Sequence, residues 1–389
     1  MIDEAKIKTE FCGNLARYLE YKVFYSHGMV ELLGNYTDRN RGKAIVAAAN
    51  QGVLAYVARF DEKVTIRHLG CEDIEFAISD LEVKEEEKFT QVGLTKEILN
   101  VLKARGYEIG GFIAVIDDDI EKGSGTCFLA AYEILITKII SHFYNEDAIS
   151  YYEMGLAAHK AENNYFNPNS SALTQLACSH GGINLIDFDD PERPTVTPLK
   201  LESSLKIVLV NPGNNKIDGL TPALEIYDDL QKVAENMFGV KSLRDVDRKD
   251  VNVVLSRYVP GISEFAKMRT QHYFGELDRV ERVVNAIERK DDLEILTCFK
   301  LSGISCKSYL GAGMVGQNYL GSPAEAMDLA NSCLGDGACK IHRTGFNGSI
   351  VCLVYPKDYS NFRLKMSERY GDNAITLITV PNWGAVEIK

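Results

Sequence analysis

Between residues 117 and 126 the chain reads Asp-Asp-Asp-Ile-Glu-Lys-Gly-Ser-Gly-Thr, and this stretch decides which kind of fold to expect. Residues 111–117 are rich in β-branched and aromatic side chains, which predicts a strand, whereas the apolar spacing over 126–144 predicts a helix. A strand, a tight glycine turn and a helix in succession are typical of mixed α/β proteins. The turn has two interpretations: its backbone N–H groups bind a phosphate, or it is only a turn that precedes the N-terminus of a helix.

The segments on either side of this junction alternate in the same way. Several strand-like segments lie close enough in sequence to pair as meanders. Further predicted strands cover residues 21–25, 43–49, 53–60 and 63–68, and further predicted helices cover 94–105 and 151–162. The first half of the chain is therefore expected to be an α/β unit.

A polar stretch over residues 189–194, which contains two prolines, interrupts this pattern and predicts a domain boundary near residue 195. The expected domains are 1–195 and 196–389, which agrees with a length of 389 residues at roughly 100–200 residues per domain. The second domain carries longer helices. Its predicted helices cover 222–237, 264–289, 293–310, 323–334 and 361–370, and its predicted strands cover 205–210, 350–355 and 374–380. The expected fold class is α/β (α+β).

The composition limits the partners of the chain. Acidic side chains outnumber basic ones by 55 to 43, and the resulting net charge of −12 repels nucleic-acid phosphates and anionic membrane surfaces. The first twenty residues lack the apolar core of a signal peptide, and no apolar run approaches about 18 residues, so we expect a cytoplasmic protein. The nine cysteines include no C-x-x-C pair, which favours free thiols over disulfides or zinc ligands.

Two further stretches place polar groups beside glycines. Residues 28–42 run from a strand into a glycine-bracketed loop that suits the hydroxyls of a sugar-like ligand; the alternative is a surface loop of turn-forming residues. The polar residues of this loop are Asn35, Tyr36, Thr37, Asp38 and Asn40. Residues 345–348, Gly-Phe-Asn-Gly, form a turn before the predicted strand at 350–355, which taken alone indicates a hairpin or a bulge.

In this order and spacing the three stretches resemble the three motifs of the galactokinase branch of the GHMP small-molecule kinases. The first family motif, P-G-R-V-N-L-I-G-E-H-T-D-Y-N-G-G, corresponds to residues 27–42. The second, G-x-G-L-S-S-S-A-A-L-E, corresponds to residues 123–133, and the third, G-G-G-F-G-G-C, to residues 343–349. In the first two motifs the agreeing positions are Gly28, Val30, Leu32, Gly34, Thr37, Asp38, Asn40, Gly42, Gly123, Gly125, Ala130, Ala131 and Glu133.

The resemblance continues between the motifs. Glu162 and Asn163 stand twelve residues before Thr174, as the family's Glu-Asn pair stands before the Asp of C-G-I-M-D-Q. His272 and Glu276 resemble the family's H-x-x-x-E-I. The resemblance implies the two-domain GHMP kinase fold, with an N-terminal domain of the ribosomal-protein S5 type, a C-terminal ferredoxin-like domain and a ligand cleft between them.

The implied activity is ATP-dependent phosphoryl transfer to a hydroxyl of a sugar or polyol, with ATP and Mg²⁺ as cofactors. Glu162 corresponds to a Mg²⁺ ligand, with a solvated helix-end charge as the alternative. Asp38 corresponds to an acceptor for substrate hydroxyls, with a turn-forming Asp as the alternative. The phosphate loop corresponds to Gly123, Ser124, Gly125 and Thr126, and the substrate-binding positions correspond to Asn35, Tyr36, Asp38 and Tyr227.

Three chemical positions of the family are occupied by other residues. Met29 stands where the family has the Arg that stabilises the transferred phosphoryl group, and Thr174 stands where it has the Asp that takes the proton. Cys127-Phe128-Leu129 replace three serines. Without the base and the charge-stabilising donor, the family mechanism would lose roughly 10⁴–10⁷-fold in rate, so the catalytic residues are left unassigned. The competing hypothesis is a catalytically silent galactokinase paralogue that binds or senses a ligand.

Other residues suggest how the site has changed. Glu31 is either a displaced base or a contact to an altered substrate, and Ser124 or Thr126 is a candidate hydroxyl ligand for Mg²⁺. The family's double Arg after the tyrosine at position 227 is absent, and Arg343 is new in the third motif, which predicts rearranged charges and an altered sugar site. Cys127 at a helix start is either an acidified, reactive thiol or a packing residue.

Overall fold

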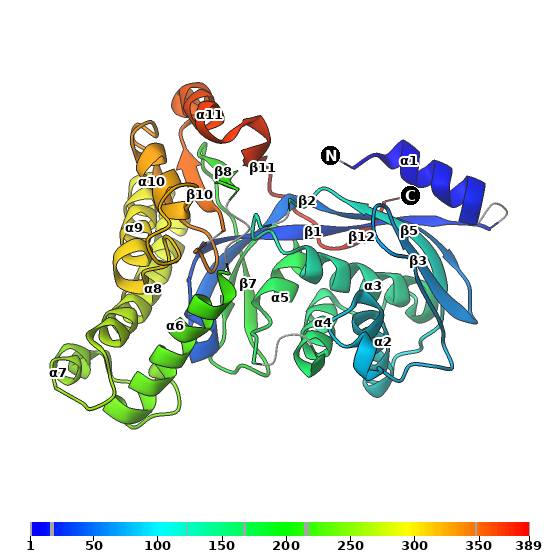
Figure 1. Cartoon of the computed structure of the whole chain (residues 1–389), viewed down its shortest axis with the longest axis horizontal. Coiled ribbons are helices and arrows are strands. Elements are labelled where there is room, and N and C mark those ends of the chain that lie inside the picture. The colour runs from blue at the N-terminus through cyan, green and yellow to red at the C-terminus, as the bar shows by residue number, and fades with distance from the viewer. Residues whose placement is uncertain are drawn as a thin grey trace.

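The computed structural model describes residues 2–15, 19–121, 123–165, 169–213, 218–346 and 348–388. These residues form two antiparallel-rich sheets, one of eight strands and one of four, each with its own helices (Figure 1). The mixed α/β class predicted from the sequence is confirmed.

The larger sheet contains the first half of the chain. Its central strands run in the order β12-β1-β2-β5-β3-β4, and β6 and β7 extend it from β2. All strand pairs are antiparallel except β3 with β5. The strands are β1 (Lys22–Leu33), β2 (Lys43–Arg59), β3 (Lys63–His68), β4 (Ile74–Ala77), β5 (Phe112–Asp118), β6 (Ile183–Asp187), β7 (Thr195–Leu199) and β12 (Val386–Glu387).

Two strands are longer than the sequence pattern predicted. β1 continues past residue 25 to Leu33, with register shifts after His27 and after Glu31. β2 joins the two predicted strands at 43–49 and 53–60 into one. Gly52 permits this continuity, because a Cβ there would lie 2.2 Å from the Ser26 carbonyl oxygen.

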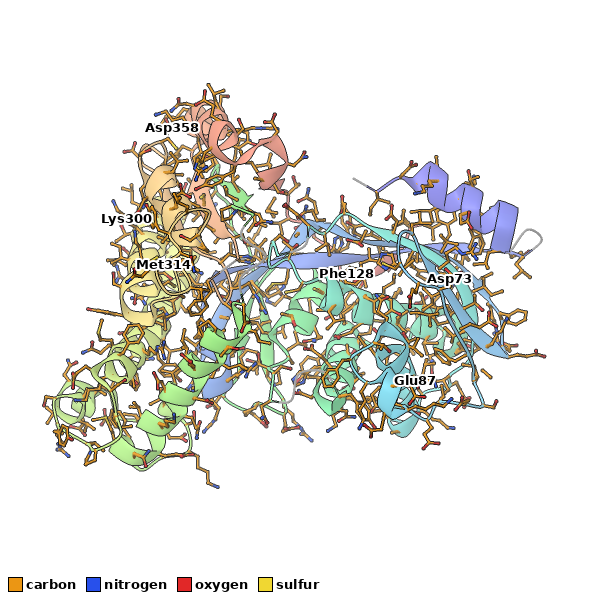
Figure 2. The ribbon with its side chains drawn as sticks, viewed as in Figure 1. Asp73, Glu87, Phe128, Lys300, Met314 and Asp358 are labelled. Carbon is orange, nitrogen blue, oxygen red and sulfur yellow. The ribbon has the colours of Figure 1, made fainter. Side chains whose placement is uncertain are left out.

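Helices cover both faces of the larger sheet. The face drawn downward in Figure 1 carries α2 (Gln91–Ala104), α3 (Phe128–Asn145), α4 (Tyr151–Tyr165) and α5 (Leu173–His180). Their apolar sides form one core with the sheet, in which Ile98, Ile116 and Leu135 are buried. Figure 2 labels Phe128 in the first turn of α3. The short α1 (Glu4–Glu10) packs Ile7 against the opposite face.

The smaller sheet has the order β11-β8-β10-β9, with every pair antiparallel. Its strands are β8 (Lys206–Val210), β9 (Ala338–Ile341), β10 (Ile350–Val354) and β11 (Ile375–Ile378). The helices of this half are α6 (Leu220–Val233), α7 (Val251–Leu255), α8 (Glu264–Arg289), α9 (Asp292–Ser305), α10 (Pro323–Asn331) and α11 (Pro356–Tyr370). The predicted helix at 361–370 therefore starts five residues earlier, at Pro356, a residue type suited to the first helical turn.

The two halves share an apolar core. Val30 of β1 and Ile45 of β2 pack in one buried cluster with Val280 of α8, Phe299 of α9 and Leu353 of β10. In addition, β12 returns to the larger sheet, where Val386 pairs with Tyr25. The expected boundary near residue 195 stays a prediction. Among the described residues, none of the helices combines the length and the apolar character needed to cross a bilayer.

Candidate functional site

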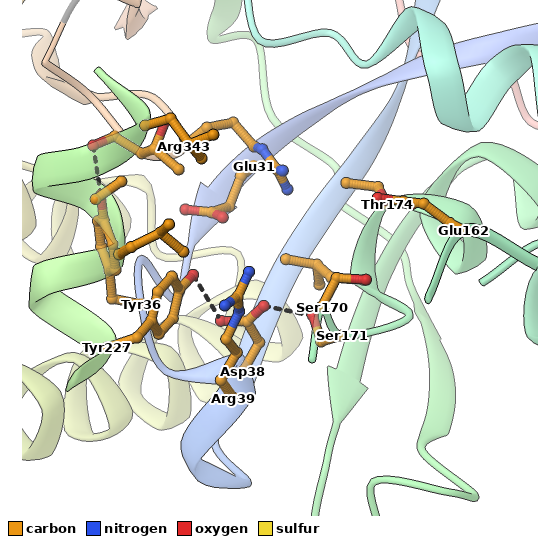
Figure 3. Close-up of a pocket in the computed structure, with 15 residues that line it drawn as sticks. Glu31, Tyr36, Asp38, Arg39, Glu162, Ser170, Ser171, Thr174, Tyr227 and Arg343 are labelled. Carbon is orange, nitrogen blue, oxygen red and sulfur yellow. Dashed lines mark hydrogen bonds between the residues drawn. The ribbon is translucent and has the colours of Figure 1, made fainter. Parts of the chain in front are cut away.

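A cavity of about 210 Å³ lies where β1, α4, α5 and α6 approach one another (Figure 3). Polar and charged side chains make up most of its wall. The lining residues that matter most below are Glu31, Asp38, Arg39, Glu162, Tyr227 and Arg343. Residues of the first and third motifs, far apart in the sequence, therefore meet at one hollow, whereas the described residues of the second motif are not among those that line it.

Three of the predicted substrate-binding residues line this cavity. The Asp38 carboxylate accepts hydrogen bonds from the Ser171 hydroxyl and, at 3.3 Å, from the Tyr227 hydroxyl. The rings of Tyr36 and Tyr227 pack with their centroids 4.9 Å apart. Asp38 is thus fixed in orientation with lone pairs still available for a ligand hydroxyl.

Asn35, the fourth predicted substrate-binding residue, is used differently. Its side-chain amide donates to the backbone oxygens of Arg343 at 2.6 Å and Ile341 at 3.4 Å. Asn35 is buried and is not among the residues that line the cavity. Its amide therefore fastens the first motif to the third.

The loop after β1 is held by the second half of the chain. His272 of α8 lies 3.0 Å from the Asn35 carbonyl oxygen through Nε2, and the Tyr36 hydroxyl donates to the Thr344 carbonyl oxygen at 2.7 Å. The Glu276 carboxylate accepts the Gly34 backbone N–H at 3.0 Å. Because these partners lie some 240–310 residues away, the loop's shape is set by tertiary contacts.

Glu31 is the carboxylate that β1 brings to the cavity. Its residue is only 3% exposed, and burial raises the pKa of its carboxyl to about 7, although Lys340 and Arg343 oppose the shift. Oε1 of Glu31 lies 3.8 Å from Nζ of Lys340, and neither atom has a hydrogen-bond partner among the described residues. Met29, two residues earlier, is fully buried in the apolar core of the larger sheet.

The predicted phosphate loop, residues 123–126, packs between the first and third motifs. Gly123 and Gly125 have φ near +80°, and a Cβ at Gly125 would lie 2.8 Å from the His342 ring. The hydroxyls of Ser124 and Thr126 are 2.7 Å apart and hydrogen-bonded to each other. Both residues are almost completely buried, so these hydroxyls are turned inward rather than toward the cavity.

Neighbouring positions complete this loop. Lys122 and Asn347, which belong to the predicted phosphate-loop stretch and the third motif, lie outside the described residues. The Cys127 thiol donates to the Gly125 carbonyl oxygen at 3.1 Å, and burial raises the pKa of this thiol. Of the two interpretations of Cys127, these observations favour packing over an activated thiol, which would need a lowered pKa.

Glu162 and Glu133 form a carboxylate pair joined by Gln175. The Gln175 amide donates to Glu133 at 2.9 Å and also to Glu162. Burial raises the pKa of the Glu133 carboxyl well above its ordinary value, and its Oε1 has no hydrogen-bond partner in the described part of the chain. Glu162 lines the cavity. One such carboxylate fits Mg²⁺, which binds through one or two carboxylates together with phosphate oxygens and waters.

Two arginines add positive charge to the cavity. The Arg343 side chain reaches across from the third motif toward Thr174 (Figure 3). Burial alone lowers the pKa of its guanidinium, but the nearby Cys127 and Glu31 raise it overall. The guanidinium of Arg39 lies 4.1 Å from the centre of the Tyr227 ring. The sequence pattern singled out Arg343 but missed Arg39, whose place in the cavity depends on α6.

Comparisons with known proteins agree with this arrangement. No protein-family model matches the sequence. A galactokinase from Actinobacillus pleuropneumoniae is 25% identical over 367 residues, covering 93% of this chain and 91% of that protein. The crystal structure of Lactococcus lactis galactokinase complexed with galactose matches 99% of both chains, with a TM-score of 0.81 and 22% sequence identity. The chain is thus similar to galactokinases over nearly its whole length, in sequence and in fold, as the galactokinase-like motifs of the GHMP kinases led us to expect.

The fold of this galactokinase-like chain is also similar to that of a more distant kinase. The mevalonate kinase of Methanococcus jannaschii matches 94% of the chain and 100% of its own length, with a TM-score of 0.65 and 14% identity. The two-domain GHMP fold expected from the three motifs is therefore confirmed.

Proposed function

We propose that the galactokinase-like chain is a sugar kinase, which transfers a phosphoryl group from ATP to a hydroxyl of a sugar or polyol bound in the 210 Å³ cavity. The observation that carries the proposal is the meeting of Glu31, Glu162 and Arg343 at this cavity. Together they supply a base, a metal-binding carboxylate and a charge-neutralising cation, which are the groups that phosphoryl transfer needs.

Glu31 takes the place of the missing base. Thr174 cannot serve, because its hydroxyl donates to Gln175 at 2.9 Å and a threonine hydroxyl has no basic form near neutral pH. A carboxylate whose pKa lies near 7 is well suited to accept the proton of a substrate hydroxyl. In this step the hydroxyl proton moves to Glu31 and the hydroxyl oxygen forms a bond to the γ-phosphorus of ATP. The bond between that phosphorus and the bridging oxygen breaks, and ADP leaves.

Arg343 takes the place of the missing arginine. It approaches the cavity from the third motif, whereas the family's arginine belongs to the first, at the position of Met29. A preorganised guanidinium stabilises the negative charge of a moving phosphoryl group. When bound, ATP supplies this group, and we propose that Glu162 holds Mg²⁺ and that the glycine turn of residues 123–126 lies against the phosphates. In the structure the Ser124 N–H donates to the Glu121 carbonyl oxygen at 3.1 Å and the Thr126 N–H to the Ser124 hydroxyl at 3.3 Å.

The silent-paralogue alternative has one observation in its favour. The hydroxyls of Ser124 and Thr126 are hydrogen-bonded to each other instead of facing the cavity. A protein that kept the sugar cavity but lost the use of its phosphate loop would bind a ligand without phosphorylating it. The two hypotheses therefore differ in one property, the turnover of ATP with an acceptor.

The test uses purified protein with Mg·ATP and a panel of hexoses, hexose acids, amino sugars and inositols. Phosphorylated product on any acceptor supports the kinase, and Glu31→Gln then lowers the rate by about 10²-fold or more. Glu368→Gln, on the exposed surface of α11, is the matched control and leaves the rate unchanged. If calorimetry detects sugar binding but no acceptor is phosphorylated, the silent paralogue is correct and the kinase proposal fails.

A further inference from the structure

A second hollow, of about 490 Å³, adjoins the sugar cavity. The two hollows share four residues, Asp38, Arg39, Ser170 and Ser171, which therefore form the wall between them. A ligand larger than a plain hexose can thus extend a substituent past this wall. The side chain that dominates the chemistry of the wall is Arg39.

Arg39 is held in place without being neutralised. Its guanidinium lies over the Tyr227 ring at 4.1 Å, a cation–π contact that leaves the N–H groups at its edge available. Among the described residues, the arginine of this loop that forms ion pairs is Arg41, with Asp189 and Asp245, and none of the ion pairs includes Arg39. The adjacent Asp38 instead receives hydrogen bonds from Ser171 and Tyr227.

Such an arginine recognises oxyanions. A guanidinium presents parallel N–H donors that match a carboxylate or phosphate group, and a half-buried guanidinium with free donors gains most from such a partner. The first galactokinase motif has tyrosine at this position, so the positive charge distinguishes this chain from the motif it resembles. Arg343 reaches the cavity from the opposite side in Figure 3, which leaves Arg39 for a second anionic group.

We propose that the ligand of this cavity is an anionic sugar, whose carboxylate or phosphate substituent binds Arg39 at the wall between the two hollows. The sugar ring then lies against Asp38 and Glu31, which accept its hydroxyls. The inference deepens the proposed function by naming the class of acceptor, but the binding of the anion requires neither ATP nor turnover.

The test measures sugar binding by calorimetry in the absence of nucleotide. The probes share one ring and differ in charge: galactose, galactosamine, galacturonate and galactose 6-phosphate, with the matching glucose series. We expect at least one anionic probe to bind at least tenfold more tightly than its neutral parent, with weaker binding at high salt. The acid and the phosphate ester serve as separate arms that identify which oxyanion the wall prefers.

Variants connect this preference to Arg39. Arg39→Gln is expected to weaken binding of the anionic probe about 10- to 100-fold and to weaken binding of the neutral parent much less, and Arg39→Lys is expected to retain part of the preference. Lys300→Gln is the charge-matched control, because Lys300 is exposed on α9, far from the cavity (Figure 2). Unchanged melting temperatures verify that each variant is folded.

Three outcomes would overturn the inference: neutral or amino sugars bind at least as tightly as the anionic ones, Arg39→Gln weakens all probes equally, or Lys300→Gln reproduces its effect. Phosphorylation of a neutral sugar without any anion preference would leave the kinase intact and remove the anion site. Tight binding of an anionic sugar without phosphorylation would support the anion site and contradict the kinase proposal.

Discussion

The backbone N–H of Glu31 donates a hydrogen bond to Nε2 of His342 at 3.0 Å. Nδ1 of the same ring lies 3.1 Å from the Ser124 carbonyl oxygen, so the proton of the neutral imidazole resides on Nδ1. Burial lowers the pKa of His342 well below its ordinary value, which keeps the ring neutral. One imidazole thus joins β1, the loop before α3 and the segment after β9, and it fixes the position of the proposed base.

Replacing His342 tests this joint. His342→Leu leaves the buried Glu31 N–H without an acceptor, and we expect it to lower the free energy of unfolding by about 1–3 kcal/mol. His342→Gln should lower the free energy of unfolding less than His342→Leu does, because its amide oxygen can still accept a hydrogen bond. Urea unfolding of the three proteins measures the difference; equal losses for both variants would contradict the role of the acceptor.

The pKa of Glu31 predicts a pH dependence of stability. Burial raises this pKa from 4.5 in the unfolded chain to about 7, so the folded protein holds the proton more tightly. The contribution of Glu31 to the free energy of unfolding is fully present below about pH 4.5 and is lost as the pH rises through 7. The free energy of unfolding changes by about 3 kcal/mol over this range. Unfolding measurements at pH 5 and pH 8 should show a larger decrease for the unmodified protein than for Glu31→Gln. An equal decrease in the free energy of unfolding for the two proteins would contradict the raised pKa of Glu31.

Glu276 shows the opposite dependence. Burial alone raises its pKa, but Arg279, His272 and Lys340 together lower the pKa to about 2. Its stabilising contribution is therefore present above about pH 4.5 and is lost as the pH falls toward 2.

We expect Glu276→Gln to lower the free energy of unfolding by about 3–5 kcal/mol at neutral pH, because the buried Arg279 guanidinium then loses the carboxylate with which it forms an ion pair. Glu288→Gln, on an exposed turn of the same helix, should change stability by less than about 0.5 kcal/mol. Chemical denaturation of both variants at pH 7 and pH 4 measures the loss of unfolding free energy and shows whether it decreases as the pH falls. A loss confined to acidic pH would argue against the buried pair.

The cysteines should differ sharply in reactivity. Cys71 is exposed, whereas Cys127 is partly buried and its raised pKa keeps it in the thiol form. Brief treatment with iodoacetamide at pH 7.5, followed by peptide mass spectrometry, should label Cys71 first and leave Cys127 unmodified. Early labelling of Cys127 would instead support an activated thiol at the start of α3.

Much of the fold was predictable from local pattern, and the exceptions have identifiable causes. The segment Asn50-Gln51-Gly52 has the composition of a turn, yet β2 runs through it because Gly52 lets the Ser26 backbone approach closely. The helix predicted over 222–237 leaves the α form after Val233 and ends in a wider π turn at Phe238. The continuity of β2 therefore depends on packing against another strand.

The candidate site was predictable where motif and geometry coincide. Asp38 and Tyr227, assigned by resemblance, are hydrogen-bonded to each other at the cavity. Asn35 has the same local signature, but its amide bonds to backbone oxygens about 300 residues away, which no local pattern reveals. Arg39 was missed for a similar reason, since only the tertiary structure places Tyr227 beneath its guanidinium.

The pairing of β12 with β1 has a consequence for protein synthesis. β1 lies at the edge of its sheet until Val386 and Glu387 reach it, and these residues leave the ribosome about 350 residues after Leu33. During translation the outer edge of β1 therefore exposes unpaired N–H and C=O groups to other nascent strands. Although the larger sheet begins near the start of the sequence, it is among the last parts of the molecule that can be completed.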